Sequence, residues 1–420
     1  MSGHDFRTFI DPTAVPRFTK EACRLTLFDY PPMLERLLGM WGPLSREPFS
    51  GITTDGRIIE GLSSLAPSAA PVQRAAQAAS AWLASLSPPM RKRACFAVDA
   101  DAWRHWQNTP LVLRDPQLEL EELDPHQRRL ALDVVAATLS ARGYELTQEV
   151  MANNAFLGEL LNMTDVMNEW SFTLSIFGAP STCEPWGWQL FGHHLALNCL
   201  FVGEKMVLSP VFMGAEPDHD NNGLRRRIFE PHERAALGMM RSLSEPERER
   251  ATLYKSMLTD DQPPGRYHPD DGRQVGGAFQ DNRIVPYEGV PLAALGVQQR
   301  RQLLDLAALF IETMPAEAAV ARMAEIESHL HATHFAWIGE ADDVNPFYFR
   351  IHSPVVMIEF DHHSGIFLAN KDPARFHVHT IVRTPNGGDY GADLLKLHYT
   401  RGGHGHTHAD GNAHTHTHEK

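Results

Sequence analysis

The stretch WGWQLFGHHLALNCLF at residues 186–201 returns in altered form as FYFRIHSPVVMIEFD at residues 347–361. Both stretches are rich in aromatic and β-branched residues and bounded by Gly, Pro, Asp and Asn, as strands are. At the same offset, FTLSIFG ending at Gly178 matches FAWIG ending at Gly339, and a further strand follows each pair, EKMVLSPVFMG from residue 204 and RFHVHTIVRTP from residue 375. Each half of the chain therefore predicts a three-stranded antiparallel meander.

A similar helix precedes each meander. LDPHQRRLALDVVAATLS from Leu123 aligns with LGVQQRRQLLDLAALFIE from Leu295, sharing Gln-Arg-Arg and Leu-Asp, with Asp124 and Gly296 at the N-cap positions. This ordered recurrence favours an internal duplication, against the alternative of chance similarity between two amphipathic patterns. Two such units would pack as pseudo-symmetric partners with a pocket at their junction.

The predicted fold class is therefore α+β, with a duplicated core of two pseudo-symmetric helix plus antiparallel β-meander units, a helical N-terminal region and a helical insert. The expected segments are an N-terminal helical region at 1–118, a first α+β repeat at 119–215, a charged helical insert and loop at 216–290, a second α+β repeat at 291–400 and a flexible His-rich tail at 401–420.

Length and charge restrict the possible partners. The chain has 420 residues and a formal net charge of -14, which disfavours binding to nucleic acid and to anionic membranes. No stretch reaches the length of a membrane-spanning helix and the N-terminus lacks a secretory pattern, so we expect a cytoplasmic protein without a membrane partner. Four cysteines without CxxC spacing predict neither a disulfide framework nor a zinc ribbon. The oligomeric state stays open.

Histidine is the unusual residue, with 23 copies. His377 and His379 alternate on a predicted strand, so their side chains point to the same face and can bind one metal ion together. Two exposed strand histidines are the alternative interpretation.

A second histidine pair lies in the other half, in Gly192-His193-His194, within the predicted middle strand. Adjacent strand residues face opposite sides, so only one of His193 and His194 is expected to reach a given site, and the other could orient a neighbour. The repeat places Pro354 and Val355 at the corresponding positions. Each half then supplies a different part of one shared site.

Imidazole ligands suit a divalent transition metal, with zinc or copper first and iron or manganese possible. A carboxylate such as Glu359 or Asp361 could complete the coordination. Because Ser and Gly follow directly, the segment from Asp361 to Gly365 is interpreted as a turn rather than as a source of ligands.

The runs WSFTLSIFGAP, PWGWQLFGHHLALN, SPVFMGAEP, FYFRIHSPVVMIEFD and HVHTIVRTPNGGDYGADLLKLHY resemble the family known as domain of unknown function 3500, from about residue 170 to residue 399. The resemblance implies no established activity. It implies that the following residues occupy motif positions of the family: Trp188, Gln189, His193, His194, Glu216, His377, His379, Arg383, Asn386, Asp389 and Tyr390. The chain departs from the pattern at Gly388, where a polar residue is expected.

Three further residues are candidates for catalysis or substrate binding. The loop from Arg383 to Gly391 has turn chemistry, and it could bring Arg383 and Asp389 beside the histidines, to neutralise an anionic substrate and to orient an imidazole. A structural ion pair is the alternative. Gln189 shares a predicted strand face with His193 and could hydrogen-bond a ligand.

The tail GGHGHTHADGNAHTHTHEK carries six more histidines and could capture metal ions. A purification tag is the alternative origin of this segment.

The expected function is that of a metal-dependent enzyme acting on a small-molecule substrate, with hydrolysis or another redox-neutral Lewis-acid reaction preferred. A copper- or iron-dependent oxidoreductase and a metal-binding or storage protein are the alternatives. No nucleotide-binding or serine-nucleophile motif is present.

Overall fold

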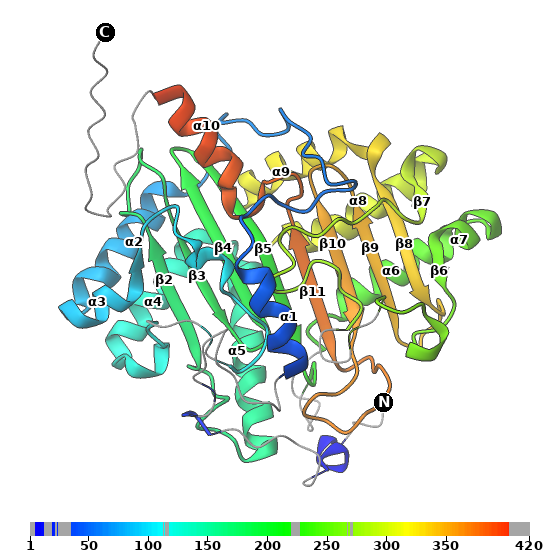
Figure 1. The fold of residues 1–420 in the computed structure, drawn as a ribbon, viewed down its shortest axis with the longest axis horizontal. Helices are drawn as coiled ribbons and strands as arrows, with labels where there is room; N and C mark the ends of the chain where they lie inside the picture. Colours follow the sequence, from blue (N-terminus) through cyan, green and yellow to red (C-terminus); the bar gives the residue numbers. More distant parts are fainter. Residues whose placement is uncertain are drawn as a thin grey trace.

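One 11-stranded sheet organises the chain, in the order β1-β2-β3-β4-β5-β11-β10-β9-β8-β6, with β7 beside β8 (Figure 1). The structure is a computed structural model and describes residues 5–11, 19–21, 23, 35–111, 113, 117–219, 227–266, 268 and 272–402. The strands are β1 (Cys95–Phe96), β2 (Phe172–Phe177), β3 (Trp186–Gly192), β4 (Leu195–Val202), β5 (Lys205–Ala215), β6 (Thr252–Tyr254), β7 (Val290–Pro291), β8 (His334–Gly339), β9 (Phe347–His352), β10 (Met357–His362) and β11 (Val378–Arg383).

The α-helices are α1 (Glu35–Ser45), α2 (Val72–Ser85), α3 (Pro88–Ala94), α4 (Pro125–Thr138), α5 (Ala141–Leu161), α6 (Glu230–Ser242), α7 (Glu245–Ala251), α8 (Val297–Ile311), α9 (Ala316–Ser328) and α10 (Ala392–Gly402). With a large, mostly antiparallel sheet, the fold is mixed α+β, as the sequence predicts. Within the described residues, no helix is both long and apolar enough to cross a bilayer.

On each side of the central strand pair, the four antiparallel strands follow one another in reverse sequence order toward the edge of the sheet. β5 pairs with β11 at the centre, and each leads through an antiparallel series, β4-β3-β2 on one side and β10-β9-β8 on the other. The outermost pairs, β1 with β2 and β6 with β8, are parallel. The strand β1 comes from the predicted N-terminal region and β6 from the predicted insert, so the sheet continues across both of those sequence ranges.

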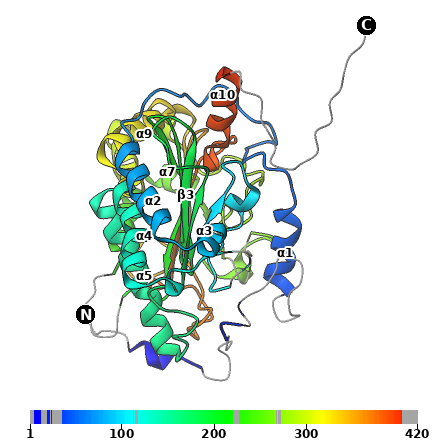
Figure 2. The ribbon, with the colours of Figure 1, turned by 90° about the vertical axis from the view of Figure 1, so that its left-hand side faces the viewer.

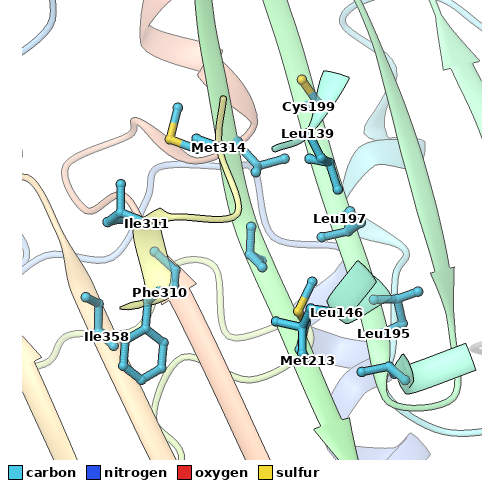
Figure 3. Packing of buried hydrophobic residues seen from close by; sticks show 14 of the residues in the cluster. Leu139, Leu146, Leu195, Leu197, Cys199, Met213, Phe310, Ile311, Met314 and Ile358 are labelled. Atoms are coloured by element: carbon cyan, nitrogen blue, oxygen red, sulfur yellow. The ribbon is translucent and has the colours of Figure 1, made fainter. Parts of the chain in front are cut away.

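The two faces of the sheet differ in what covers them. Viewed along the edge of the sheet, α2, α4, α5 and α9 lie on one side, and α1, α10 and irregular segments lie on the other (Figure 2). The helix-covered face packs through apolar side chains, among them Leu195 and Leu197 in one half of the sheet and Ile358 beside Phe310 in the other (Figure 3). This packing spans both halves of the sheet.

The opposite face carries buried polar side chains. Residues paired across a ladder point to the same face, and the pairs include Gln189 with Asn198 and Asp361 with His379. Burial of such groups is unfavourable unless they find partners, so this polar face is where a function is to be sought.

Each meander has four strands, which corrects the predicted three. The run 186–201 divides at His193 and His194, which form a two-residue turn between β3 and β4. His194 has a φ of 61°, a left-handed conformation that histidine adopts more readily than β-branched residues do. In the second half, Pro354 and Val355 lie in the corresponding turn, closed by a hydrogen bond from Ser353 N to Val356 O of 2.8 Å.

The helices α4 and α8 begin in the same way. Gln127 Oε1 accepts the N–H of Asp124 at 3.2 Å and its Nε2 donates to Ser85 O, at the end of α2. In the second half, Gln299 Oε1 accepts the N–H of Gly296 at 2.7 Å, and its Nε2 donates to the carbonyl oxygen of the last residue of α6. Each glutamine therefore caps one helix and ties it to the end of another.

Replacing either glutamine by alanine removes both contacts, so we expect Gln127→Ala and Gln299→Ala each to lower the free energy of unfolding by about 1–2 kcal/mol. Chemical denaturation measures this loss. Gln148→Ala, at an exposed position of α5, is the matched control and should have little effect. A loss at only one of the two capping positions would contradict their equivalence.

Candidate metal centre

A group of paired residues lies at the centre of the polar face, where β5, β11 and β10 run side by side. His379 of β11 pairs with Gly214 of β5 on one side and with Asp361 of β10 on the other. The ladder extends by one step, because the N–H of His363 donates to His377 O at 2.8 Å. Because side chains alternate along a strand, His377 and His379 share a face, as the sequence predicts.

His194 lies in the turn between β3 and β4, and its ring approaches those of His377 and His379. A Cβ atom at Gly214 would lie 3.0 Å from His379 Cδ2 and 3.2 Å from His194 Cδ2, so a glycine is needed for both rings to approach. The ring of His194 lies 5.1 Å from that of His379 and 5.4 Å from that of His377, between centroids. The two halves of the sheet thus bring three histidines together.

The nitrogen atoms of these rings have the spacing that a metal ion requires. One nitrogen each of His194, His377 and His379 can be chosen so that all three lie within 4.8 Å of one another. Nε2 of His377 and Nε2 of His379 are 3.1 Å apart. Two nitrogens bound at about 2.0–2.1 Å to one tetrahedral zinc ion would be roughly 3.3 Å apart. These residues therefore fit a transition-metal ion without rearrangement of the strands.

The environment keeps the imidazoles neutral, which is the form that binds metals. Burial lowers the pKa of His193 to about 3. Burial, followed by the neighbouring histidines, also lowers the pKa of His194, His377 and His379 well below the usual value.

Two buried carboxylates flank the histidines. Glu216 Oε1 accepts the N–H groups of residues 366, 367 and 368 and lies 3.7 Å from His377 Nδ1. Burial raises the pKa of Glu216 to about 7, although these backbone hydrogen bonds oppose the shift. Burial likewise raises the pKa of Asp361 to about 6, against the opposing charge of Arg273. Glu359 is held elsewhere, because it accepts the Tyr348 hydroxyl at 2.5 Å and two backbone N–H groups.

These shifts predict how the stability of the metal-free protein depends on pH. In the unfolded chain a histidine has a pKa near 6.5. As the pH falls below that value, the unfolded chain binds protons that the buried rings of His193, His194, His377 and His379 do not, and stability is lost. Glu216 and Asp361 act in the opposite direction, because the folded chain retains their protons to higher pH. These four histidines outweigh the two carboxylates, and burial lowers the pKa of His232 and His352 as well, so we expect a loss of roughly a few kcal/mol per pH unit near pH 5.5.

Urea denaturation of chelator-treated protein at about pH 7 and pH 5.5 measures this loss, with His126→Ala, an exposed position of α4, as the control. A metal-free protein that gains stability over this interval would contradict the expected sign.

His193 lies beside the three-histidine group rather than within it. Its ring stacks on that of His194, with centroids 3.9 Å apart, and its Nδ1 forms a hydrogen bond of 2.9 Å with Asn154 Oδ1. This arrangement suits the orienting role expected for one member of the pair. Because both histidines are in a turn, the alternation of strand faces does not apply to them.

His363 lies beside the three-histidine group and was missed from the sequence. The segment interpreted as a turn is instead strand as far as His362, and His363 follows it, buried, with its ring 4.8 Å from that of His377 and 4.6 Å from that of His379. The Ser-Gly signal for a turn was correct only beyond this residue. The signal that could have revealed His363 is its period-two spacing from Asp361.

Gln189 and the Arg383 group lie in other parts of the polar face. Gln189 Nε2 donates to Trp103 O at 2.7 Å and to Asn198 Oδ1 at 2.6 Å, which ties it into the neighbouring structure. Arg383 lies four residues along β11 from His379, roughly 13 Å away at about 3.3 Å per residue.

Arg383 and Asp389 do contact each other, in a buried network. Arg383 Nη1 donates to Asp281 Oδ1 at 2.7 Å and to Asp389 Oδ2 at 3.1 Å, while Nε and Nη2 donate to the carbonyl oxygens of Gly276 and Gly277 at 2.8 Å. Each of the three guanidinium nitrogens therefore donates to a protein group. These contacts fit the structural ion pair better than a role in binding substrate.

The fold and the site together define a mixed α+β protein with a buried multi-histidine centre, in the middle of a mostly antiparallel sheet. The chain belongs to the family described as protein of unknown function DUF3500, whose profile matches residues 68–392, in agreement with the resemblance of the motifs. All the histidines of the centre fall within the matched range. Comparison with curated proteins and with solved structures finds no match.

Proposed function

We propose that the chain is a metal-dependent enzyme in which His194, His377 and His379 bind a divalent transition metal. The observation that carries the proposal is the convergence of three neutral imidazoles from opposite halves of the sheet, with their nitrogens within 4.8 Å of one another. A centre that only stabilised the fold would not need to lie among buried polar groups on one face.

The substrate of the proposed enzyme is a small molecule. His377 and His379 are 0 % and 2 % exposed, so a polymer has no direct approach to them. A bound ion would supply Lewis acidity, to polarise a carbonyl group or to activate water. Glu216 lies beside His377, and its Oε2 is buried without a hydrogen-bond partner among the described residues. In this proposal, Glu216 holds the proton that such a reaction moves.

Elemental analysis of the purified full chain tests the metal. We expect at least one transition-metal ion per chain that survives dialysis against imidazole, which competes for the isolated histidines of the tail. A chain that holds no ion after loading would overturn the proposal. The histidines of the tail lie outside the described residues.

A copper- or iron-dependent oxidoreductase is the second candidate. The observation that favours it is the all-imidazole donor set, which copper and iron accept as readily as zinc does. Optical and electron paramagnetic resonance spectra of the protein, taken as isolated, distinguish the two functions. A storage role is disfavoured, because a deeply buried site exchanges ions slowly.

We further propose that the two halves of the sheet arose by duplication. Three features support this: the mirrored strand order about β5 and β11, the matching capping glutamines, and the glycines Gly178 and Gly339, which both have positive φ at the same offset in their halves. In an experimentally determined structure, the backbone of β2–β5 should superimpose on that of β8–β11 with their preceding helices. Failure of the helices to follow the strands would contradict the proposal.

A further inference from the structure

A cavity lies on the helix-covered face of the sheet, where its two halves meet. It is lined by β5 and β11, whose residues Val211 and Val382 pair across the ladder. Further lining residues come from the end of α8, from α9, from the start of α10 and from the segment 63–68. Counted out to its open mouth, the empty space is about 730 Å³, which is within the range of small-molecule sites.

The sheet separates this cavity from the proposed metal centre. Val211 and Val382 belong to the apolar cluster on the helix-covered face. Their neighbours Phe212 and Ile381 point to the opposite face, where the ring of Phe212 lies 5.2 Å from that of His379. A molecule in the cavity would therefore occupy a second site, distinct from the one that holds the substrate of the proposed enzyme.

The inner lining of the cavity is apolar. Its buried members come from β5, from β11, from the stretch that runs from α8 into α9, and from α10: Met206, Leu208, Val211, Val382, Phe310, Ile311, Met314, Ala318 and Leu394. Phe310, Ile311 and Met314 are seen in Figure 3. Apolar walls around an empty space lack partner atoms on one side, so a hydrocarbon group gains by filling that space.

The rim of the cavity is polar, and most of its charges are compensated within the protein. Arg322 Nη1 donates to Glu325 Oε2 at 2.6 Å, and its Nη2 donates to two oxygen atoms of neighbouring segments. Asp393 accepts from the Ser63 hydroxyl and from the N–H of Leu394. It lies in the first turn of α10, where the helix dipole favours a negative charge.

Lys205 is the charged residue of the rim that these contacts leave out. None of the described residues forms an ion pair with its ammonium group. Ser64 Oγ, also at the rim, accepts the N–H of Ala66 at 3.1 Å, and its hydroxyl proton has no acceptor among the described residues. Two donors, one of them positively charged, are thus available to an anionic oxygen.

We propose that this cavity binds a medium-chain monocarboxylic acid. The hydrocarbon chain lies among the apolar side chains, and the carboxylate lies at Lys205 and Ser64. A single carboxylate fits, because the rim offers one cation that the protein does not compensate. The inference goes beyond the proposed metal-dependent function and does not depend on it, because the two sites lie on opposite faces of the sheet.

Calorimetric titration of the full chain with butanoate, hexanoate and octanoate tests the apolar part of the site. We expect one acid per chain and an affinity that rises about fourfold for each added methylene group, the gain expected when such a group leaves water. 1-Octanol has the same chain length without the charge and should bind more weakly than octanoate. Chelator-treated protein should give the same affinities, which separates this site from the metal centre.

Two substitutions in α9 fill the cavity. Ala318→Leu and Ala321→Leu, at lining positions, should each weaken octanoate binding roughly tenfold or more. Ala321 is exposed, so its variant remains informative if the buried Ala318→Leu variant does not fold. Val320→Leu, at an exposed position of the same helix that does not line the cavity, is the matched control.

Lys205→Met tests the polar end, because methionine keeps much of the side-chain stem and removes the charge. We expect octanoate to bind roughly fivefold more weakly, the effect of losing a partly exposed ion pair, while the affinity for 1-octanol stays the same. Lys371→Met, at an exposed position, is the matched control. Thermal melting verifies that each variant is folded.

Three results would overturn the proposal. One is the absence of binding, or an affinity that does not rise with chain length. Another is octanoate binding that is unchanged in the folded Ala318→Leu and Ala321→Leu proteins, since the acid would then lie elsewhere. The third is equal affinity for octanoate and 1-octanol, unaffected by Lys205→Met, which would remove the carboxylate from the assignment.

Discussion

The variant that carries both His377→Ala and His379→Ala is expected to lose its tightly bound metal. Loss of an outer hydrogen-bond partner weakens metal binding by roughly 10–100-fold, and loss of a ligand should cost more. Removing two of three ligands should therefore weaken binding roughly ten-thousand-fold or more. Elemental analysis after imidazole dialysis should find less than about a tenth of an ion per chain.

The double variant also leaves a cavity, so its folding must be measured independently. His377→Gln with His379→Gln preserves more of the side-chain volume and should lose metal in the same way. His126→Ala should bind as the unaltered chain does. Retention of the full metal content by a folded double variant would refute the assignment of these two ligands.

The second large effect concerns the buried network around Arg383. Asp281 accepts from Arg383 Nη1 at 2.7 Å and from Arg104 Nε at 2.8 Å, and it is 1 % exposed. Burial alone would raise the pKa of Asp281, but the charges of Arg383 and Arg104 outweigh burial, and the pKa is lowered. The carboxylate is therefore ionised and depends on both arginines.

Arg383→Ala should lower the free energy of unfolding by about 3–5 kcal/mol, because it leaves buried carboxylates without their partner. Denaturant titration, or soluble yield where the variant does not fold, measures the loss. Arg301→Ala removes an exposed pair with Asp305 and should change stability by less than about 1 kcal/mol. A folded Arg383→Ala protein of normal stability that has lost activity would instead restore the predicted role in substrate binding.

The sequence predicted the α+β class, the stretches that form the long strands and most of the histidine centre. His377 and His379 were found because period-two spacing is local, and the positions of the two glycine-bounded strand pairs suggested the repeat that we propose. The four-stranded meander was missed, because a two-residue turn of histidines lacks the usual Asn-Gly or Asp-Gly signal. His363 was missed because the Ser-Gly turn signal applies to the residues that follow it. That signal does not indicate where the side chain of His363 points.

Other parts could not be derived from local patterns. Gly214 matters because it lies under two rings that come from different strands, and this contact exists only after β5 pairs with β11. Gln189 shares a strand face with many polar residues that could be its hydrogen-bond partners. One partner, the carbonyl oxygen of Trp103, comes from the N-terminal part of the chain and could not be identified from local sequence. Partners distant in sequence determine these roles.

The pairing of β5 with β11 also has a consequence for synthesis on the ribosome. β5 ends at residue 215, but its partner begins only at residue 378, so the long central strand emerges well before the strand that covers its free edge. An open strand edge is a template for association with other chains. A nascent chain stalled between these two points should therefore be prone to aggregation, and chaperone binding would be needed most during that interval.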